Sequence, residues 1–219
     1  MTGVPAGEVT LSDLRTEKKW LVELQPFALA TFPTTQAQYT AVTGRNPSSG
    51  AGKDHPVENL SWWDTLKFCD ALSEQEGRTP VYRLDAENEA VVWEPQADYR
   101  LPSEAEWEFA CRAGTPGPRY GQLEEIAWYT GNSGVHSHSA GQKDPNGFGL
   151  FDMLGNVWEW CWDIYDAEVY KTYRVLRGGG WADEHWSCRA SVRRRSHPTF
   201  RIEDVGFRVA RSIPTGETL

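Results

Sequence analysis

Four cysteines are the side chains of this 219-residue sequence best suited to nucleophilic or soft-metal chemistry. They are Cys69, Cys111, Cys161 and Cys188. No two of them form a C-x-x-C pair, which excludes a zinc ribbon and a thioredoxin-type motif. Four are also too few for a disulfide scaffold in a chain of this length. The sequence therefore predicts a cytoplasmic protein whose thiols are mostly reduced and buried.

His136 and His138 form a second candidate for metal chemistry. They stand two residues apart in a segment rich in glycine and serine. Two imidazoles at this spacing can ligate a metal ion, but a solvated loop tip has the same pattern. We favour the solvated tip and leave the ligand interpretation open.

Arginines gather near the C-terminal end. Residues 174–211 hold nine arginines and four carboxylates, a net charge of +5; the whole chain carries −9, so the remainder carries −14. These guanidinium groups either tie loops to buried carboxylates and carbonyls or form a basic ligand patch. The acidic total argues against nonspecific nucleic-acid binding by the whole protein.

Helices that would position these residues are marked by capping boxes. The box Ser61–Asp64 opens a helix that ends at Gly77, and Ser103–Glu106 opens a second that ends at Gly114. A further helix is expected near Thr35–Thr43. Apolar positions of the two boxed helices recur at helical spacing, which predicts that one face of each is buried.

Short strands account for the rest of the predicted regular structure. Short strands are expected between residue 20 and the helix near Thr35, as at Trp20–Leu24, and a small hairpin joins Tyr82–Leu84 to Val91–Trp93. Later strands are expected at Val157–Trp160, Val175–Arg177, Ser191–Arg193 and Phe207–Ala210, the last of them central. Residues 44–56 and 115–150 have loop character. Together these elements predict an α+β domain.

Composition excludes some classes of protein. The sequence has 20 glycines and 13 prolines, which predicts abundant loops. No apolar run approaches the roughly 18 residues of a membrane span. The first residues lack the basic and apolar regions of a secretory signal, so none is expected. The 11 tryptophans are mostly predicted to fill the core, since aliphatic residues are few.

Five motifs in a fixed order carry a resemblance to a known family. They are Pro56–Trp62, Tyr99–Glu108, Asn146–Trp160, Arg177–Trp181 and Gly206–Ala210. With these motifs the sequence resembles the formylglycine-generating enzyme family, also called the sulfatase-modifying factor family, from about residue 20 to residue 211. The resemblance implies one C-type-lectin-like domain over residues 1–219. It does not imply the chemistry, because one fold hosts many functions.

The oxidases of this family imply a copper site that this sequence only half retains. They place one cysteine two residues after the tryptophan of the Gly-Gly-x-Trp motif and another seven residues after it, and the two thiolates hold Cu(I). Here Trp181 is followed by Asp183 and Cys188 at those positions. A carboxylate is a poor replacement for a thiolate on Cu(I), so copper is not expected. Cys188 is then a buried structural thiol, or a catalytic one if Cys161 replaces the missing partner.

Other members of the family imply iron or calcium. Sulfoxide synthases need three histidines on an added helical bundle, which this sequence lacks. Family members that bind Ca2+ place their ligands in the segment matching residues 152–159. The resemblance carries this site over as Asp152 and Glu159 side chains with carbonyls of Gly155 and Val157, a set of hard oxygen ligands. In the alternative, the two carboxylates simply brace this turn.

Family members diversified by retroelements imply a ligand-binding face. Their variable residues lie in stretches that match 182–187 and 196–203. The candidate ligand-binding residues are Ala182, Asp183, Glu184, His185, Trp186, Ser187, Ser196, His197, Thr199, Phe200 and Ile202. Aromatic groups beside charged ones have the composition of a binding patch. An ordinary mixed surface with Trp186 packed inward is the alternative.

These observations favour a non-catalytic protein that binds an unidentified protein or small molecule through residues 182–203. The alternative is an oxygen- and copper-dependent oxidase using Cys188. A regulatory module within a larger system is a third interpretation.

Overall fold

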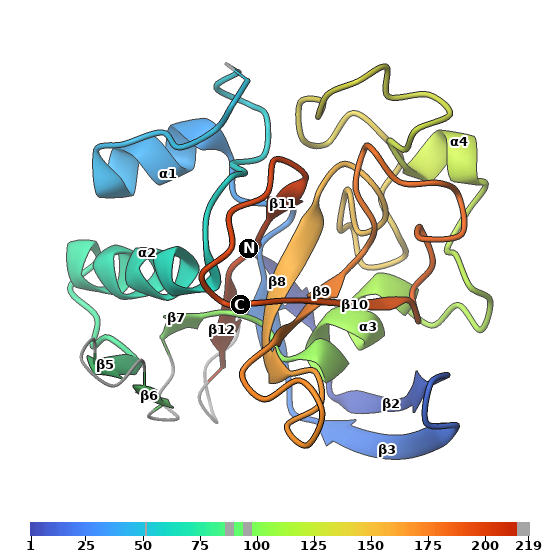
Figure 1. The fold of residues 1–219 in the computed structure, drawn as a ribbon, viewed down its shortest axis with the longest axis horizontal. Coiled ribbons are helices and arrows are strands. Elements are labelled where there is room, and N and C mark those ends of the chain that lie inside the picture. The colour runs from blue at the N-terminus through green and yellow to red at the C-terminus, as the bar shows by residue number, and fades with distance from the viewer. Residues whose placement is uncertain (51, 86–89, 94–97, 214–219) are drawn as a thin grey trace.

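The computed structural model describes residues 1–50, 52–85, 90–93 and 98–213, and Figure 1 shows their arrangement. Helices α1 (Gln36–Thr43) and α2 (Trp62–Gln75) contact one another at one side of the molecule. Helix α3 (Glu104–Arg112) packs against the central strand β8 (Trp158–Ile164). The short helix α4 (Leu123–Ile126) lies among long loops on the side of the view away from α1 and α2.

The three longer helices begin at reciprocal capping boxes. The capping residues are Thr35, Ser61 and Ser103. The side chain of each accepts a hydrogen bond from the backbone N–H of the residue three positions later, and the side chain of that later residue accepts the backbone N–H of the capping residue. Two orphan backbone donors are thereby satisfied at each helix start. The boxes predicted at Ser61 and Ser103 are confirmed. Helix α2 ends just before Gly77, and α3 ends at a left-handed Ala113.

One four-stranded sheet is built from both ends of the chain. Its order is β1 (Thr2–Val4), β4 (Phe27–Leu29), β12 (Ala210–Ser212) and β7 (Tyr99–Arg100). The last strand is therefore interior, as predicted. Residues 207–209 of the predicted strand lie outside β12, although the carbonyls of Phe207 and Val209 accept from the N–H groups of Thr34 and Ala30.

A second four-stranded sheet carries the loops of interest. Its order is β10 (Arg193–Ser196), β9 (Arg174–Arg177), β8 and β11 (Val205–Gly206), with β11 parallel to β8. The strand predicted at Ser191–Arg193 begins only at Arg193. Strand β10 pairs with β9 alone and forms one edge of this sheet.

Two hairpins complete the regular structure. Strands β5 (Tyr82–Asp85) and β6 (Ala90–Trp93) form the hairpin that the sequence predicted. Strands β2 (Gly7–Asp13) and β3 (Lys18–Leu24) form a longer one, of which the sequence analysis expected only Trp20–Leu24. The alternation of buried Val9 and Leu11 along β2 packs this hairpin against α3.

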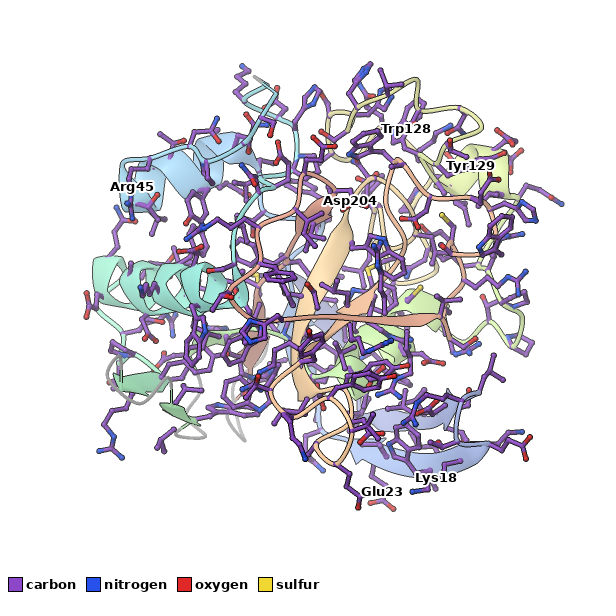
Figure 2. The ribbon with its side chains drawn as sticks, in the orientation of Figure 1. Lys18, Glu23, Arg45, Trp128, Tyr129 and Asp204 are labelled. Carbon is purple, nitrogen blue, oxygen red and sulfur yellow. The ribbon has the colours of Figure 1, made fainter. Side chains whose placement is uncertain are left out.

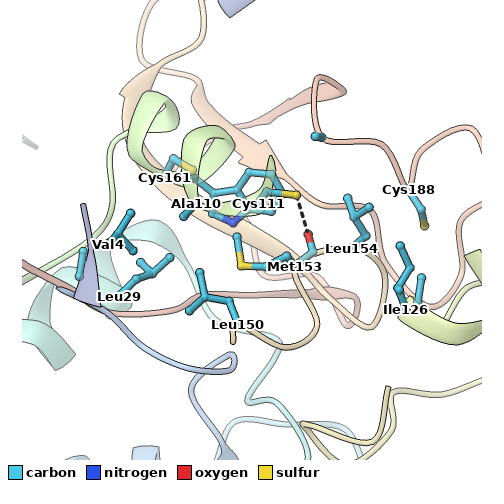
Figure 3. Close-up of a cluster of buried hydrophobic side chains, with 14 of the residues drawn as sticks. Val4, Leu29, Ala110, Cys111, Ile126, Leu150, Met153, Leu154, Cys161 and Cys188 are labelled. Carbon is cyan, nitrogen blue, oxygen red and sulfur yellow. Dashed lines mark hydrogen bonds between the residues drawn. The ribbon is translucent and has the colours of Figure 1, made fainter. Parts of the chain in front are cut away.

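Aromatic side chains fill much of the core, as predicted. Trp62, Trp107, Trp158 and Trp160 are fully buried. A second group of buried residues, shown in Figure 3, surrounds Met153 and includes three of the four cysteines. All four thiols are free and buried, which confirms the expectation of reduced, buried cysteines. Among the described residues, no helix has both the length and the apolar character that crossing a bilayer requires.

Several arginines of the C-terminal region are buried against glutamates. The pairs with buried side chains are Arg177–Glu108, Arg193–Glu104 and Arg208–Glu159. A buried charge is tolerated only when it is paired and hydrogen-bonded, and a guanidinium supplies several donors at once. For these residues the structural interpretation of the arginines is correct. The whole arrangement, with little regular secondary structure, has the α+β class predicted from the sequence.

Candidate functional site

Asp183 braces the loop that follows the Gly-Gly-Gly-Trp turn. Its carboxylate accepts the indole N–H of Trp158 at 2.5 Å, the N–H of Gly180 at 3.0 Å and the hydroxyl of Ser187 at 3.2 Å. Its carbonyl accepts the N–H of Thr130 at 2.9 Å. The carboxylate therefore points back into the fold, and a role for Asp183 in ligand binding stays a prediction.

Cys188 is buried behind the same loop. A Cβ placed on Gly179 would lie 3.0 Å from its Sγ, so the sulfur packs tightly against the turn. Burial raises the pKa of the thiol to about 12, and the nearby Asp183 carboxylate adds to the rise while Arg119 opposes it. A thiol in this environment is protonated at neutral pH, and a protonated thiol is a poor nucleophile and metal ligand.

Cys161 does not lie beside Cys188. Figure 3 draws the two at opposite ends of the buried cluster, with Cys111 and Leu154 between them. Among the described residues, no group of three or more His, Cys, Asp or Glu side chains is placed to hold a metal ion. The rearranged thiol pair required by the oxidase interpretation is therefore not formed.

We expect all four thiols to resist modification in the native protein. With 5,5′-dithiobis(2-nitrobenzoic acid) at pH 8, native protein should show no fast-reacting thiol, because the cysteines are buried and their pKa values are raised. Protein unfolded in guanidinium chloride should show four. A thiol that reacts rapidly in native protein and disappears in Cys188→Ala would contradict the buried placement of Cys188.

The outward side chains of the two predicted stretches include exposed aromatic rings. Trp186 is 54% exposed and Phe200 is 55% exposed, so the alternative of an inward Trp186 is excluded. The His185 ring meets Trp186 edge-on at 5.2 Å, and the His197 ring lies 5.6 Å from Phe200. Each stretch thus presents a histidine–aromatic pair at its surface.

The remaining predicted residues divide by exposure. Ala182, Glu184 and Thr199 are exposed, Ser187 and Ile202 are half-buried, and Ser196 is buried. Ser196 ends strand β10, and Ile202 packs against the core around α2. These last two side chains support the surface rather than form it.

Backbone hydrogen bonds hold both stretches in place. The N–H of Trp62 donates to the carbonyl of Pro198 and that of Asn59 to Ile202, both at 3.0 Å. On the other stretch, the N–H of Thr130 donates to the carbonyl of Asp183 at 2.9 Å, and the Arg119 side chain donates to the carbonyl of His185 at 2.5 Å. The loops are therefore fixed by the framework motifs, while their outward side chains make few contacts with the framework.

Arg194 joins the two stretches and was not among the predicted site residues. Its guanidinium lies 3.9 Å from carboxylate oxygens of both Asp183 and Asp204, and 5.4 Å from the Trp158 ring centroid. Figure 2 shows Asp204 close to β8 at the centre of the molecule. Burial raises the pKa of Asp204, whereas Arg194 lowers it. The Arg-Arg-Arg run was visible in the sequence, but not which of its members faced these carboxylates.

The family model of the sulfatase-modifying factor enzyme 1-like domain matches residues 1–213. This chain belongs to that family. The match begins before the residue-20 limit of the sequence resemblance, consistent with β1 and β2 contributing buried Val4, Val9 and Leu11 to the fold.

Members and neighbours of the sulfatase-modifying factor family carry different names. Treponema denticola variable protein 1 superposes with a TM-score of 0.89 at 30% identity, covering 97% of this chain and 95% of that one. A chaperone protein LppX of Paenibacillus barcinonensis is 31% identical over 87% of this chain and 82% of its own length. The formylglycine-generating enzyme of Streptomyces coelicolor is 33% identical over 68% of this chain, which spans 60% of that enzyme's length. The C-type-lectin-like fold that the resemblance implied is therefore the fold of this chain.

The carboxylates of the calcium site that the family implies have protein partners in this structure, and the calcium site stays a prediction. Both Glu159 oxygens accept from Arg208 at 2.7 Å, and one also accepts the indole N–H of Trp107 at 2.7 Å. The Asp152 carboxylate accepts the N–H of Gly141 at 2.6 Å. Burial raises the pKa of Asp152 to about 6, which leaves the carboxyl mostly ionised at neutral pH. A guanidinium thus lies beside Glu159, and the Asp152 carboxylate is bonded to Gly141 and Asn156.

Calcium is accordingly expected not to stabilise the protein. Thermal unfolding in 5 mM CaCl2 and in EDTA should give the same midpoint, because a ligand stabilises only the state that binds it. Magnesium chloride at the same ionic strength controls for screening. A rise in Tm seen with calcium alone, and lost in Asp152→Asn, would restore the predicted site.

The histidine pair forms part of a stacked surface cluster. His138 stacks on Trp128 at 3.8 Å, its Nε2 lies 2.7 Å from the carbonyl of Ser133, and the His136 ring is 4.8 Å away. The Lys143 Nζ lies over the Trp128 ring, 4.0 Å from its centroid. His138 is half-buried and held by these contacts, so the expected solvated tip describes only the exposed His136.

Proposed function

We propose that this member of the sulfatase-modifying factor family is a non-catalytic ligand-binding protein. Its binding face comprises residues 182–187 and 196–203. The observation that carries the proposal is the pair of exposed aromatic side chains, Trp186 and Phe200, on loops that are fixed from behind by backbone hydrogen bonds. Large, rigid aromatic groups on a preorganised support are favourable anchors, because little conformational entropy is lost on binding.

The position of Asp183 supports the absence of catalysis. The carboxylate stands where the oxidases of the family place a copper thiolate, and it is engaged by Trp158, Gly180 and Ser187. Replacing a soft ligand by a hard one disfavours Cu(I). The high structural similarity to a variable protein agrees with a binding role.

Variation of the outward side chains is part of this proposal. Ala182, Glu184, His185, Trp186 and Phe200 project from the framework without bracing it, so their replacement should cost little stability. Such positions suit diversification by a retroelement. Sequencing sibling copies of the gene should show differences concentrated at these codons, and an even spread of differences along the gene would contradict it.

Indole titration tests the binding face directly. We expect indole added to 15N-labelled protein to shift the amide signals of residues 184–187 and 197–202. The shifts should be lost in the double variant Trp186→Ala/Phe200→Ala. Trp20→Ala is the matched control, since Trp20 is 37% exposed on strand β3, outside the face. Shifts confined to the apolar cavity of about 340 Å3 beside α1 and α2, lined by Phe32, Phe68 and Leu72, would contradict the proposed face.

Copper titration tests the absence of oxidase chemistry. Competition of reduced protein with a Cu(I) chelator should show no binding beyond that of Cys188→Ala. Tight one-to-one binding that vanishes in this variant, together with oxidation of a cysteine peptide by oxygen, would establish the oxidase alternative instead.

A further inference from the structure

Strand β10 presents a free edge between the two stretches of the proposed binding face. It pairs with β9 on one side only, and among the described residues no backbone group of 193–196 bonds to any segment outside that pairing. Unpaired N–H and C=O groups of an edge strand can pair with another extended chain. The edge strand is therefore a template for strand addition.

The arginines of β10 alternate between the two faces of the sheet. Arg193 turns inward to Glu104, with which it makes a charged hydrogen bond of 2.5 Å. Arg195, two residues on, lies on the same face above Tyr165 and Tyr170, whereas Arg194 lies on the other face beside Trp158. A strand added to β10 would thus meet one exposed guanidinium on each face.

Arg195 is oriented but not neutralised. Its guanidinium stacks on Tyr170, 3.7 Å from the ring centroid, and Arg195 takes part in none of the ion pairs within 4.0 Å among the described residues. Stacking uses the face of the guanidinium and leaves its in-plane N–H groups available. Because the side chain is already ordered by the ring, an anion can bind it at reduced entropic cost.

A row of rings connects Arg195 to the proposed binding face. The ring centroids of Tyr170 and Tyr173 are 6.1 Å apart, those of Tyr173 and His197 are 5.4 Å apart, and those of His197 and Phe200 are 5.6 Å apart. The row continues from the loop between β8 and β9 into residues 197–200. A ligand on Phe200 and a ligand group on Arg195 would therefore occupy one continuous surface.

Arg194 is the second exposed cation. Its side chain is 46% exposed, and its guanidinium lies 3.9 Å from the Asp183 and Asp204 carboxylates, which is longer than a hydrogen bond. Arg194 is therefore loosely paired. Glu184 and Glu203 lie exposed on the flanking stretches and limit how far an anionic surface could extend. This charge pattern fits a narrow acidic segment along β10 better than a broad polyanion.

We infer that the partner is an extended acidic peptide that adds a strand to the edge of β10. Its backbone pairs with residues 193–196, and two consecutive carboxylates reach Arg194 on one face and Arg195 on the other. This inference rests on the proposed function, since it names the ligand class of the same face. Backbone pairing supplies affinity, and the two arginines select an acidic pair of side chains.

Fluorescence anisotropy with a defined peptide tests the inference. The probe is a fluorescein-labelled ten-residue peptide with a central Glu-Glu pair flanked by alternating valine and threonine. Binding should weaken about tenfold when either Arg194→Gln or Arg195→Gln is introduced, and further when the central pair is Gln-Gln. Arg45→Gln should leave it unchanged, because Arg45 is exposed at the far end of α1 (Figure 2). Raising the salt concentration should weaken it.

N-methylation separates strand addition from simple charge attraction. A peptide methylated at alternate backbone nitrogens on its pairing edge should lose binding, because it cannot donate to β10. Equal binding of methylated and unmethylated peptides would overturn strand addition, as would tighter binding of a heparin oligosaccharide that displaces the peptide. If no acidic peptide binds while indole still shifts residues 184–187, the ligand class is wrong and the proposed face stands. If neither binds, both fail.

Discussion

Replacing Arg208 with methionine is expected to lower the free energy of unfolding by about 3–5 kcal/mol. Arg208 and Glu159 are 0% and 1% exposed, and the two side chains meet through a pair of 2.7 Å hydrogen bonds. Removing the guanidinium leaves the carboxylate buried, with the Trp107 indole as its remaining donor among the contacts described. An uncompensated buried charge costs far more than the net value of the intact pair.

The cost of this change extends beyond the ion pair. Arg208 also donates to the carbonyls of Ala30, Phe151 and Asp152, at 3.0–3.2 Å. These carbonyls belong to two separate segments that meet around the buried guanidinium. Because a buried carbonyl without a donor is itself destabilising, the loss should fall at the upper end of the range.

Urea denaturation at pH 7 measures the effect, with Arg45→Met as the matched control. Arg45 is exposed at the end of α1, and its change should stay within about 0.5 kcal/mol. The double variant Arg208→Met/Glu159→Gln should be more stable than Arg208→Met alone, because no unpaired charge is left. Equal free energies of unfolding for the single and double variants would show that the unpaired Glu159 carboxylate is not the cause of the destabilisation. Arg208→Lys, which keeps the charge, provides a measurable variant where Arg208→Met does not fold.

The sequence predicted the local elements well because their signals are local. Ser61 and Ser103 each form a capping box with a residue only three positions away, and both helices form as expected. The abundance of loops and the burial of most tryptophans followed from composition. In contrast, the β2–β3 hairpin was seen only in part, since its turn at residues 14–17 lacks the Asn-Gly or Asp-Gly signal of a tight hairpin.

The candidate site depended on partners that no sequence spacing reveals. Asp183 was identified as the residue that breaks the copper pair, but its inward bonds to Trp158 and Gly180 depend on how the turn folds back onto β8. Glu159 was expected to ligate calcium, yet Arg208, 49 positions away, binds both its oxygens. A carboxylate's partner is decided by tertiary packing, and here a protein cation takes that position.

Gly155→Ala is expected to destabilise the fold by about 3 kcal/mol or more. Gly155 has φ +76°, and an added Cβ would lie 2.4 Å from the carbonyl oxygen of Trp128 and 2.8 Å from its nitrogen. A left-handed backbone costs an alanine about 1–2 kcal/mol, and forcing backbone atoms apart adds about 1–3 kcal/mol. Since the clashing atoms are main chain, no side-chain rotation relieves them.

Gly44→Ala separates these two contributions. Gly44 has nearly the same φ, +73°, but an added Cβ there has nothing within 4 Å, so only the backbone cost of about 1–2 kcal/mol applies. Urea denaturation of both variants should therefore show a larger loss for Gly155→Ala by at least about 1 kcal/mol. Equal losses would mean that the Trp128 segment moves aside freely. A larger loss for Gly155→Ala means that the Trp128 segment does not move aside. This segment connects the Gly155 turn to the binding face, because the N–H of Thr130, two residues after Trp128, donates to the carbonyl of Asp183. The framework beneath the binding face is then rigid.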